Sequence, residues 1–181
     1  MCTRNSLPIG ILACVLSGAT HAGELPGLGQ PLSEAEVAAA DYTVMPDGEG
    51  LPAGRGNARR GADVYRQHCL ACHGEEGTGG VNDGLTGGHG SLTTEQPVKT
   101  IGSYWPYATT VFDYVRRAMP YQTPGVLSND DIYSVTAYLL FLNGIVEEDA
   151  EIDADSLPRV RMPNRDNFEW DFTPTEQPGD P

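Results

Sequence analysis

Basic residues are scarce in this sequence: 11 Lys and Arg stand against 25 Asp and Glu in 181 residues, a formal charge of −14. A protein that binds nucleic acid through phosphate contacts needs the opposite balance, so we exclude that class of function. Long apolar runs are also rare, because apart from one segment near the N-terminus none approaches the roughly 18 residues of a membrane span. We therefore expect a soluble mature protein without a membrane span.

The sequence also lacks the alternation of apolar and polar residues that is typical of strands, while Gly (22) and Pro (14) are frequent. High Gly and Pro content indicates extensive loops. The periodicity that exists has helical spacing and falls in three stretches. The first runs from Gly56-Asn57 into Cys69, the second from Trp105-Pro106, with proline at the first helical position, to Pro120, and the third from the cap Ser128 to Asn143-Gly144. These patterns predict an all-α fold with three main helices.

Residues 1–22 have the parts of a secretory signal peptide. Arg4 lies in a short n-region, an apolar run spans residues 7–16, and small residues precede the expected cleavage point. We therefore expect export and a periplasmic location. Lipidation at Cys14 is the alternative, and we disfavour it because Leu12 is bulky for that kind of site.

Composition divides the rest of the chain into three parts. Residues 23–56 form an N-terminal arm rich in Pro and Gly, with one short helix expected where Ser33 and Glu36 make a capping box. Residues 57–144 carry the three main helices, and residues 145–181 form an acidic, Pro-rich C-terminal arm. A domain of this size with long Gly-rich loops buries little apolar surface, so we expect a cofactor to complete its core.

The two cysteines that remain after cleavage, Cys69 and Cys72, belong to the pattern Cys-Leu-Ala-Cys-His, which ends at His73. This is the attachment signature of c-type haem. A zinc site would need a second pair of ligands, for which His68 and His89 are the other strong nitrogen donors. A thioredoxin-like redox pair would follow a strand, and a plain disulfide is the third alternative. We predict one covalently bound haem c, held by both cysteines, with His73 as an iron ligand.

The second iron ligand decides between electron transfer and chemistry at the iron. We predict Met119, because it ends the second helix just before Pro120, and the short loop to the last helix can fold back over the haem. Methionine is more often a packing residue, but the loop setting and the following proline favour a ligand here. The lower-ranked candidates are Met45, Met162, His68 and His89.

Together these residues resemble a class I c-type cytochrome: Gly61 and Tyr65 precede the CxxCH motif, a distal Met follows, and the last helix carries Tyr138 and Leu139. The resemblance implies the class I cytochrome c fold, with three main helices around one covalently bound haem and irregular N- and C-terminal arms. It also implies that the first and last helices cross, with Gly61 packed near Tyr138.

Two further segments are similar to one branch of that family, the SoxD-type cytochrome subunits of sulfane dehydrogenase. They are Tyr-Trp-Pro-Tyr-Ala-Thr at 104–109 and Met-Pro-Asn-Arg-Asp at 162–166. The resemblance implies a molybdenum-cofactor sulfur dehydrogenase subunit as partner, and electrons pass from there to a downstream electron-accepting cytochrome.

Tyr104 and Trp105 are our candidates for hydrogen bonds to a haem propionate, because each carries a polar tip on a large apolar body. The alternative that they are ordinary core aromatics has equal standing. Many class I cytochromes use a proline carbonyl to accept the Nδ1 proton of the iron-bound His, but no Pro lies between His73 and Pro97. We expect a carbonyl of the Gly-rich loop, near residues 83–85, to take that role.

Our leading hypothesis is a periplasmic electron-transfer cytochrome that serves an oxidoreductase of reduced sulfur compounds and is not a catalyst by itself. A free electron shuttle is the second hypothesis, and the long arms count against it. A catalytic or sensing haem protein with an open iron site is the third, and a Met119 ligand would close that site. In the leading hypothesis the arms bind the partner, chiefly through the Arg, Met and aromatic residues of 159–172.

Overall fold

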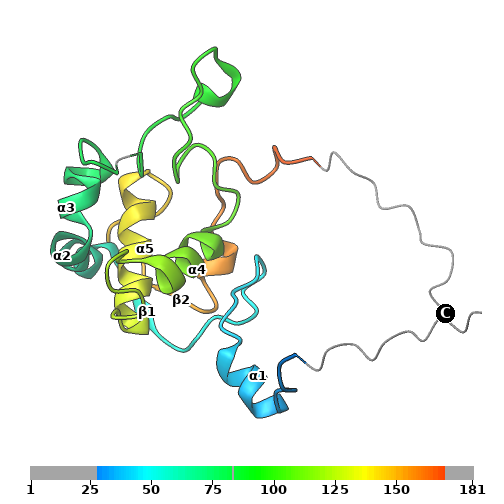
Figure 1. The fold of residues 1–181 in the computed structure, drawn as a ribbon. Helices are drawn as coiled ribbons and strands as arrows, with labels where there is room; N and C mark the ends of the chain where they lie inside the picture. Colours follow the sequence, from blue (N-terminus) through cyan, green and yellow to red (C-terminus); the bar gives the residue numbers. More distant parts are fainter. Residues whose placement is uncertain (1–27, 83, 170–181) are drawn as a thin grey trace, which may run out of the picture.

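The computed structural model describes residues 28–82 and 84–169, so the expected signal peptide lies outside the described residues. The elements in chain order are α1 (Glu34–Ala40), β1 (Arg55–Gly56), α2 (Ala58–His68), α3 (Leu70–His73), α4 (Ala108–Ala118), α5 (Asn129–Leu142) and β2 (Ile152–Asp153), with 3-10 turns η1 (Glu75–Gly77), η2 (Ser91–Thr93) and η3 (Leu157–Arg159). Figure 1 shows α2, α4 and α5 gathered in one body, with α1 at its edge. The predicted all-α class is confirmed, since the described strands are one two-residue pair.

Local capping fixes the starts of α2 and α5 as predicted. The Asn57 side chain accepts a hydrogen bond from the backbone N–H of Arg60, and that of Ser128 accepts one from Asp131. The predicted start of α4 was wrong by two residues. Tyr107 holds an extended backbone (φ −135°, ψ 134°) and is the N-cap, so Pro106 precedes the helix and is not its first residue.

Helices α2 and α5 cross at Gly61, as the resemblance implied. A Cβ atom on Gly61 would lie 1.9 Å from the backbone oxygen of Ser134 and 2.7 Å from Cβ of Tyr138. Such distances are far below van der Waals contact, so only glycine allows the two backbones to approach this closely. The rings of Tyr65 and Tyr138 pack beside the crossing with centroids 5.3 Å apart.

The core lies between α4 and α5. Phe112 and Tyr133 are both fully buried, and their ring centroids are 4.5 Å apart. Leu140 is also fully buried and belongs to the same hydrophobic cluster. Because α4 is anchored to α5 in this way, its C-terminal end is placed by the core, and that end carries Met119.

The N-terminal arm is tied to α4 over residues 42–50. The backbone N–H of Val44 donates to Asp113 Oδ1 at 3.1 Å, and Thr109 Oγ1 donates to the carbonyl of Pro46 at 3.2 Å. Arg116 donates to the carbonyl of Tyr42 at 3.1 Å. We call these three contacts the arm strap. Upstream of the strap, α1 has its predicted capping box but buries none of its residues.

The C-terminal segment to residue 164 is part of the packed body, although its composition suggested an arm beyond the three-helix region. Ile152, Leu157 and Met162 are buried, with 4%, 0% and 1% of their surface exposed. β2 pairs antiparallel with β1, which precedes α2. The sequence did not reveal the burial of these three residues, because they are widely spaced among acidic residues and prolines and follow neither a helical nor a strand period. Met162, offered as an interface residue, is therefore a core residue.

No helix among the described residues is both long and apolar enough to cross a membrane.

Candidate haem-binding site

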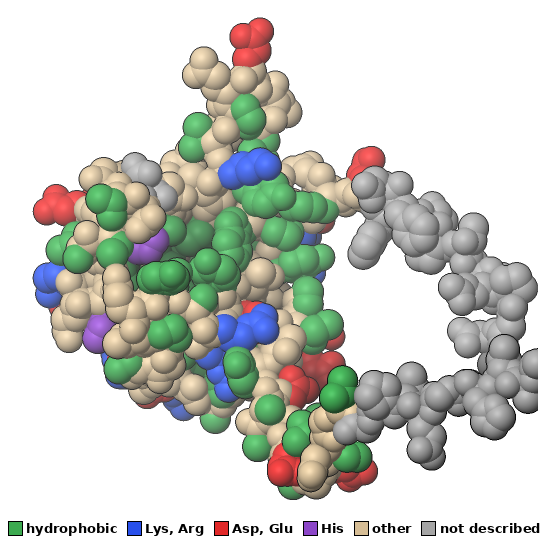
Figure 2. Space-filling view, in the orientation of Figure 1, with side chains coloured by type: hydrophobic (Ala, Val, Ile, Leu, Met, Phe, Trp, Pro, Cys, Tyr) green, Lys and Arg blue, Asp and Glu red, His purple; other side chains and the backbone are tan. Residues whose placement is uncertain are grey.

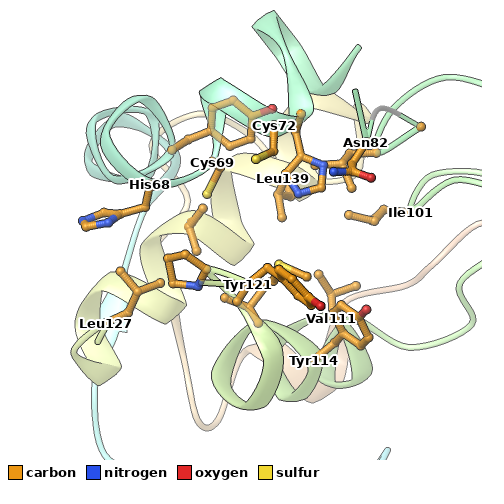
Figure 3. A pocket seen from close by; sticks show the side chains of 18 of the residues that line it. His68, Cys69, Cys72, Asn82, Ile101, Val111, Tyr114, Tyr121, Leu127 and Leu139 are labelled. Carbon is orange, nitrogen blue, oxygen red and sulfur yellow. The ribbon is translucent and has the colours of Figure 1, made fainter. Parts of the chain in front are cut away.

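A cavity of about 590 Å³ opens beside α3 and is walled by α2, α4, α5 and the loops that join them. Figure 3 shows Cys69, Cys72 and His68 on one side of it and Val111, Tyr114, Tyr121 and Leu127 on the other. No Asp, Glu, Lys or Arg is among the residues that line the cavity. In a chain with 25 acidic residues, this hollow is therefore suited to a large, mostly apolar group.

The three motif residues lie on one short turn. Cys69 ends α2 and caps α3, and its carbonyl accepts hydrogen bonds from the backbone N–H of Cys72 (3.1 Å) and His73 (2.9 Å). The two thiols and the imidazole all line the cavity. The spacing of the motif thus places two nucleophilic sulfurs and one nitrogen ligand on a single wall.

The alternatives to haem attachment find no support here. Cys69 and Cys72 are both free, and burial together with the neighbouring Cys72 raises the pKa of Cys69 to about 11. A redox-active pair needs a lowered pKa for its attacking thiol. Within residues 28–82 and 84–169, no cluster of three or more His, Cys, Asp or Glu is arranged to hold a metal ion. The geometry therefore disfavours a thioredoxin-like pair and a zinc centre.

The loop after the motif folds back on it through close backbone contacts. Gly74 has φ +74°, a region that favours glycine, and the hydroxyl of Tyr65 donates to its carbonyl at 2.9 Å. A Cβ on Gly80 would lie 2.2 Å from the carbonyl oxygen of Cys72, and the N–H of Asn82 donates to that same oxygen at 2.9 Å. These contacts hold the motif turn in place.

The Nδ1 atom of His73 is buried, and no described residue forms a hydrogen bond with it. Of the carbonyls expected to accept its proton, that of Leu85 is engaged by the side chain of Asn143 at 3.1 Å. Asp83 lies outside the described residues. The prediction of a loop carbonyl for His73 therefore stays a prediction.

Met119 lines the cavity, as its predicted role requires. It is the C-cap residue of α4, and its N–H donates to the carbonyl of Val115 at 3.1 Å. The structure distinguishes Met119 from the other candidate ligands. Met162 is buried in the core, Met45 is exposed, His89 lies outside the cavity lining, and His68 is an exposed residue at the cavity's rim. Met119 is thus the methionine among the described residues that lines the same cavity as His73, and its role as a ligand stays a prediction.

The two propionate candidates have different positions. Trp105 lines the cavity and packs edge-on against Tyr114, with ring centroids 5.8 Å apart. Tyr104 does not line it: its ring packs against Phe168 at 5.5 Å and lies under the Lys99 ammonium at 4.8 Å. The structure thus brings only Trp105 to the site, because Tyr104 ends the turn 101–104 and its ring is held by Phe168 and Lys99.

Asn143 is a positioning residue that the sequence did not reveal as such. It is 5% exposed, and its side-chain amide donates to the carbonyls of Leu85 and Leu139. It thereby joins the end of α5 to the loop that follows the haem motif. In the sequence, Asn143 before Gly144 only marked the end of a helix, and nothing local shows a contact 58 residues away.

The residues present fit haem c. The cavity volume falls within the range of cofactor pockets, its lining is predominantly apolar, and it presents two thiols, the imidazoles of His73 and of the exposed His68, and one thioether. Cys69 and Cys72 would hold the group covalently, and His73 and Met119 are the side chains available to its iron.

Comparison with known proteins agrees with this geometry. Residues 56–139 match the family described as cytochrome C oxidase, cbb3-type, subunit III. No curated protein matches the chain. Among solved structures the fold is similar to a chain of the sulfane dehydrogenase SoxCD from Paracoccus pantotrophus, with a TM-score of 0.74 and 44% sequence identity over 80% of this chain and 72% of that chain. On the strength of this likeness and of the CxxCH motif at the cavity wall, the chain belongs to the c-type cytochromes of the SoxD-like kind.

Proposed function

We propose that this chain is an exported, monohaem electron-transfer cytochrome. In this proposal it accepts electrons one at a time from a molybdenum-containing sulfur dehydrogenase subunit and passes them to a downstream cytochrome. The observation that carries the proposal is the presence of both His73 and Met119 in one uncharged cavity with the paired thiols.

Haem c held in this cavity supplies an iron that changes between ferrous and ferric states. The chain's own residues set the conditions for that change. His73 and Met119 would both ligate the iron and so close it to a substrate, and the predominantly apolar lining would limit the contact of the group with water. A thioether ligand and a predominantly apolar lining both favour a relatively high reduction potential. This arrangement supports electron transfer over catalysis or gas sensing at the iron.

The likeness to SoxCD supports the choice of partner. That relative is a sulfane dehydrogenase, and the match covers 72% of its chain at 44% identity. The single CxxCH motif in this sequence supports one haem. The apolar leader at residues 1–22 supports export and hence a periplasmic location, where c-type haem is attached.

The experiment uses the full chain, exported and loaded with haem. We expect a redox titration to follow a one-electron curve, the ferrous protein to bind carbon monoxide poorly and the ferric protein to bind cyanide poorly. Produced together with the molybdenum-containing dehydrogenase subunit of the same organism, it should copurify and its haem should be reduced when a sulfane substrate is added.

The alternatives give different results. Ready binding of carbon monoxide by the ferrous wild type would favour a sensing or catalytic haem. A closed iron site combined with no copurification and no substrate-dependent reduction would restore the free electron shuttle.

A further inference from the structure

The haem cavity has a second imidazole, that of His68, which neither haem attachment nor the predicted iron ligation uses. His68 is the last residue of α2, directly before Cys69, and its side chain is exposed. In the space-filling view of Figure 2, the histidines are small isolated patches near a green hollow, and Figure 3 shows the His68 ring at the edge of the cavity, on the side of Cys69. Because the Cys69 sulfur would hold the edge of the haem, the His68 ring would lie beside that group and still contact water.

His68 is also the lining side chain that can change its charge near neutral pH. No Asp, Glu, Lys or Arg lines the cavity. Histidine ordinarily gains or loses a proton between about pH 5 and 8. The other lining histidine, His73, would have one ring nitrogen on the iron, and Cys69 and Cys72 would be thioethers in the haem-loaded chain. These three groups would therefore keep a constant charge, and His68 would not.

The charged groups nearest to this imidazole in the sequence keep their charge over the same range. On α2, Arg66 pairs with Asp63 at 2.8 Å. Beyond the motif, η1 carries Glu75 and Glu76, both exposed. On α5, burial raises the pKa of Tyr138, so its phenol stays neutral. Carboxylates, guanidinium groups and phenols ordinarily titrate outside this range, so none of these groups competes with the imidazole for a proton there.

The charged groups of the elements that face α2 and the cavity are of the same kinds. Asp130 and Asp131 at the start of α5 pair with Arg60, near the opposite end of α2. Arg60 precedes the imidazole by eight residues, which is about 12 Å along a helix axis. Across the cavity, the loop 119–127 contains no Asp, Glu, Lys or Arg, and its Tyr121 is 79% exposed. The residues of α4 and α5 that line the cavity carry no charge either.

We propose that His68 is a proton-uptake site coupled to the electron transfer of this chain. Ferrous haem carries one positive charge less than ferric haem, so it stabilises a neighbouring cation more. Protonated His68 is such a cation, and the predominantly apolar lining screens the interaction less than water does. On reduction the chain takes one electron from its donor and a fraction of a proton from water, and on oxidation it releases both. This inference rests on the proposed function, to which it adds a coupled proton.

The coupling is modest because His68 is exposed, so water and salt screen its charge. We expect the ferrous state to bind the proton about threefold more tightly than the ferric state. Linkage is reciprocal, so at a fixed potential the ferrous-to-ferric ratio falls about threefold as pH rises from about 5 to 8. Since tenfold corresponds to about 59 mV for a one-electron couple, the reduction potential falls by about 28 mV.

The test measures the reduction potential of the exported, haem-loaded full chain at several pH values from about 5 to 8. His68→Gln removes the charge, so its potential should stay near the alkaline value of the unmodified chain. His68→Lys keeps a positive charge throughout this range, so its potential should stay near the acid value. The matched control is His89→Gln, because His89 is an exposed histidine outside the cavity lining. This control should show the full threefold change.

Nuclear magnetic resonance gives a second readout that a merely structural role would not move. The ring protons of His68 report its protonation in the ferrous and in the ferric chain. The titration midpoint of His68 should be higher in the ferrous chain by the same threefold ratio that the potentials give. The ring of His89 should titrate at equal midpoints in both states, and rising salt should reduce the difference at His68.

The outcomes distinguish this inference from the proposed function. A potential that does not change with pH in the unmodified chain overturns the inference, and so does an unchanged step in His68→Gln. Loss of the step in His89→Gln overturns it as well, because the position beside the cavity would then have no special role. Each of these results leaves the electron-transfer proposal standing. Ready binding of carbon monoxide, or no reduction by the dehydrogenase subunit, refutes the proposed function whatever the pH profile.

Discussion

The two walls of the haem cavity are built in different ways. The α3 wall, residues 69–85, is held mostly by contacts between near neighbours in sequence, such as Tyr65 to Gly74 and Asn82 to Cys72. The α4 wall, residues 105–119, is held by the arm strap, whose hydrogen bonds join residues 63 to 74 positions apart. The attachment side is thus a local structure, and the Met119 side depends on the folded chain as a whole.

The different construction of the two walls predicts different effects for substitutions in each. Damage to the α3 wall should prevent haem attachment or disturb it directly. Damage to the strap should leave the haem attached but change how well Met119 reaches it. The following experiments test this division, from the largest expected effect to the smallest.

Removing both attachment residues should have the largest effect. In the Cys69→Ala/Cys72→Ala variant we expect no covalent haem and little folded domain. A cavity of about 590 Å³ without its group costs an amount comparable to the whole stability of a small domain. Haem staining on denaturing gels and circular dichroism measure the two effects. Recovery of a cooperatively folded, haem-free protein would contradict this prediction.

The α2–α5 crossing should be nearly as sensitive. Gly61→Ala puts a Cβ within 1.9 Å of the Ser134 carbonyl, so we expect a loss of about 3 kcal/mol or more in the free energy of unfolding. The control is Gly87→Ala, where φ is +85° but no atom lies within 4 Å of the added Cβ. Backbone strain alone should cost about 1–2 kcal/mol there. Equal losses in chemical denaturation would mean that close packing at Gly61 is unimportant.

Substitutions of Met119 and Met162 should distinguish the predicted iron ligand from the core residue. Met119→Ala should keep covalent haem, lower the reduction potential and abolish the far-red absorption band of ferric haem with a methionine ligand. Met162→Ala should keep that band and lower the unfolding free energy by about 2–5 kcal/mol, because Met162 is 1% exposed. Loss of the band in Met162→Ala and its survival in Met119→Ala would reverse the assignment.

The strap can be broken at Asp113, which is 6% exposed, accepts from the N–H of Val44 and pairs with Arg117. We expect Asp113→Ala to cost about 1–3 kcal/mol and to weaken the far-red band while haem attachment stays complete. Asp63→Ala removes an exposed pair with Arg66 at 2.8 Å and should cost less than about 0.5 kcal/mol. If Asp113→Ala impairs haem attachment instead, the division between the two walls is wrong.

The smallest effect concerns pH. The hydroxyl of Ser128 donates to Asp131 at 2.6 Å, and this contact, with help from Arg60, holds the pKa of Asp131 below its usual value of 3.8. A carboxyl with a lowered pKa in the folded state stabilises the protein above its usual pKa, and that stabilisation disappears as pH falls through the lowered value. Unfolding measured between neutral pH and pH 3 should therefore show a flatter acid decline in Asp131→Asn. An identical decline in both proteins would exclude this contribution.

Much of the fold was predictable because it depends on local signals. Ser128 and Asn57 mark helix starts by side-chain caps, and Cys69, Cys72 and His73 define the haem wall by spacing within one helical turn. The sequence misplaced the start of α4 because proline is favourable at a first helical position, whereas here the extended backbone of Tyr107 delays the helix.

Only the tertiary structure decided which distant segments come into contact. The sequence by itself determined the chemistry of the site, since thiols, imidazole and thioether are fixed by residue type and spacing. It did not show that Tyr104 turns away from the cavity, that Leu157 and Met162 complete the core, or that Asn143 ties α5 to the loop at Leu85. Such contacts join residues whose separation leaves no local pattern, because they depend on how the folded chain brings residues 42–50 and η3 onto α4.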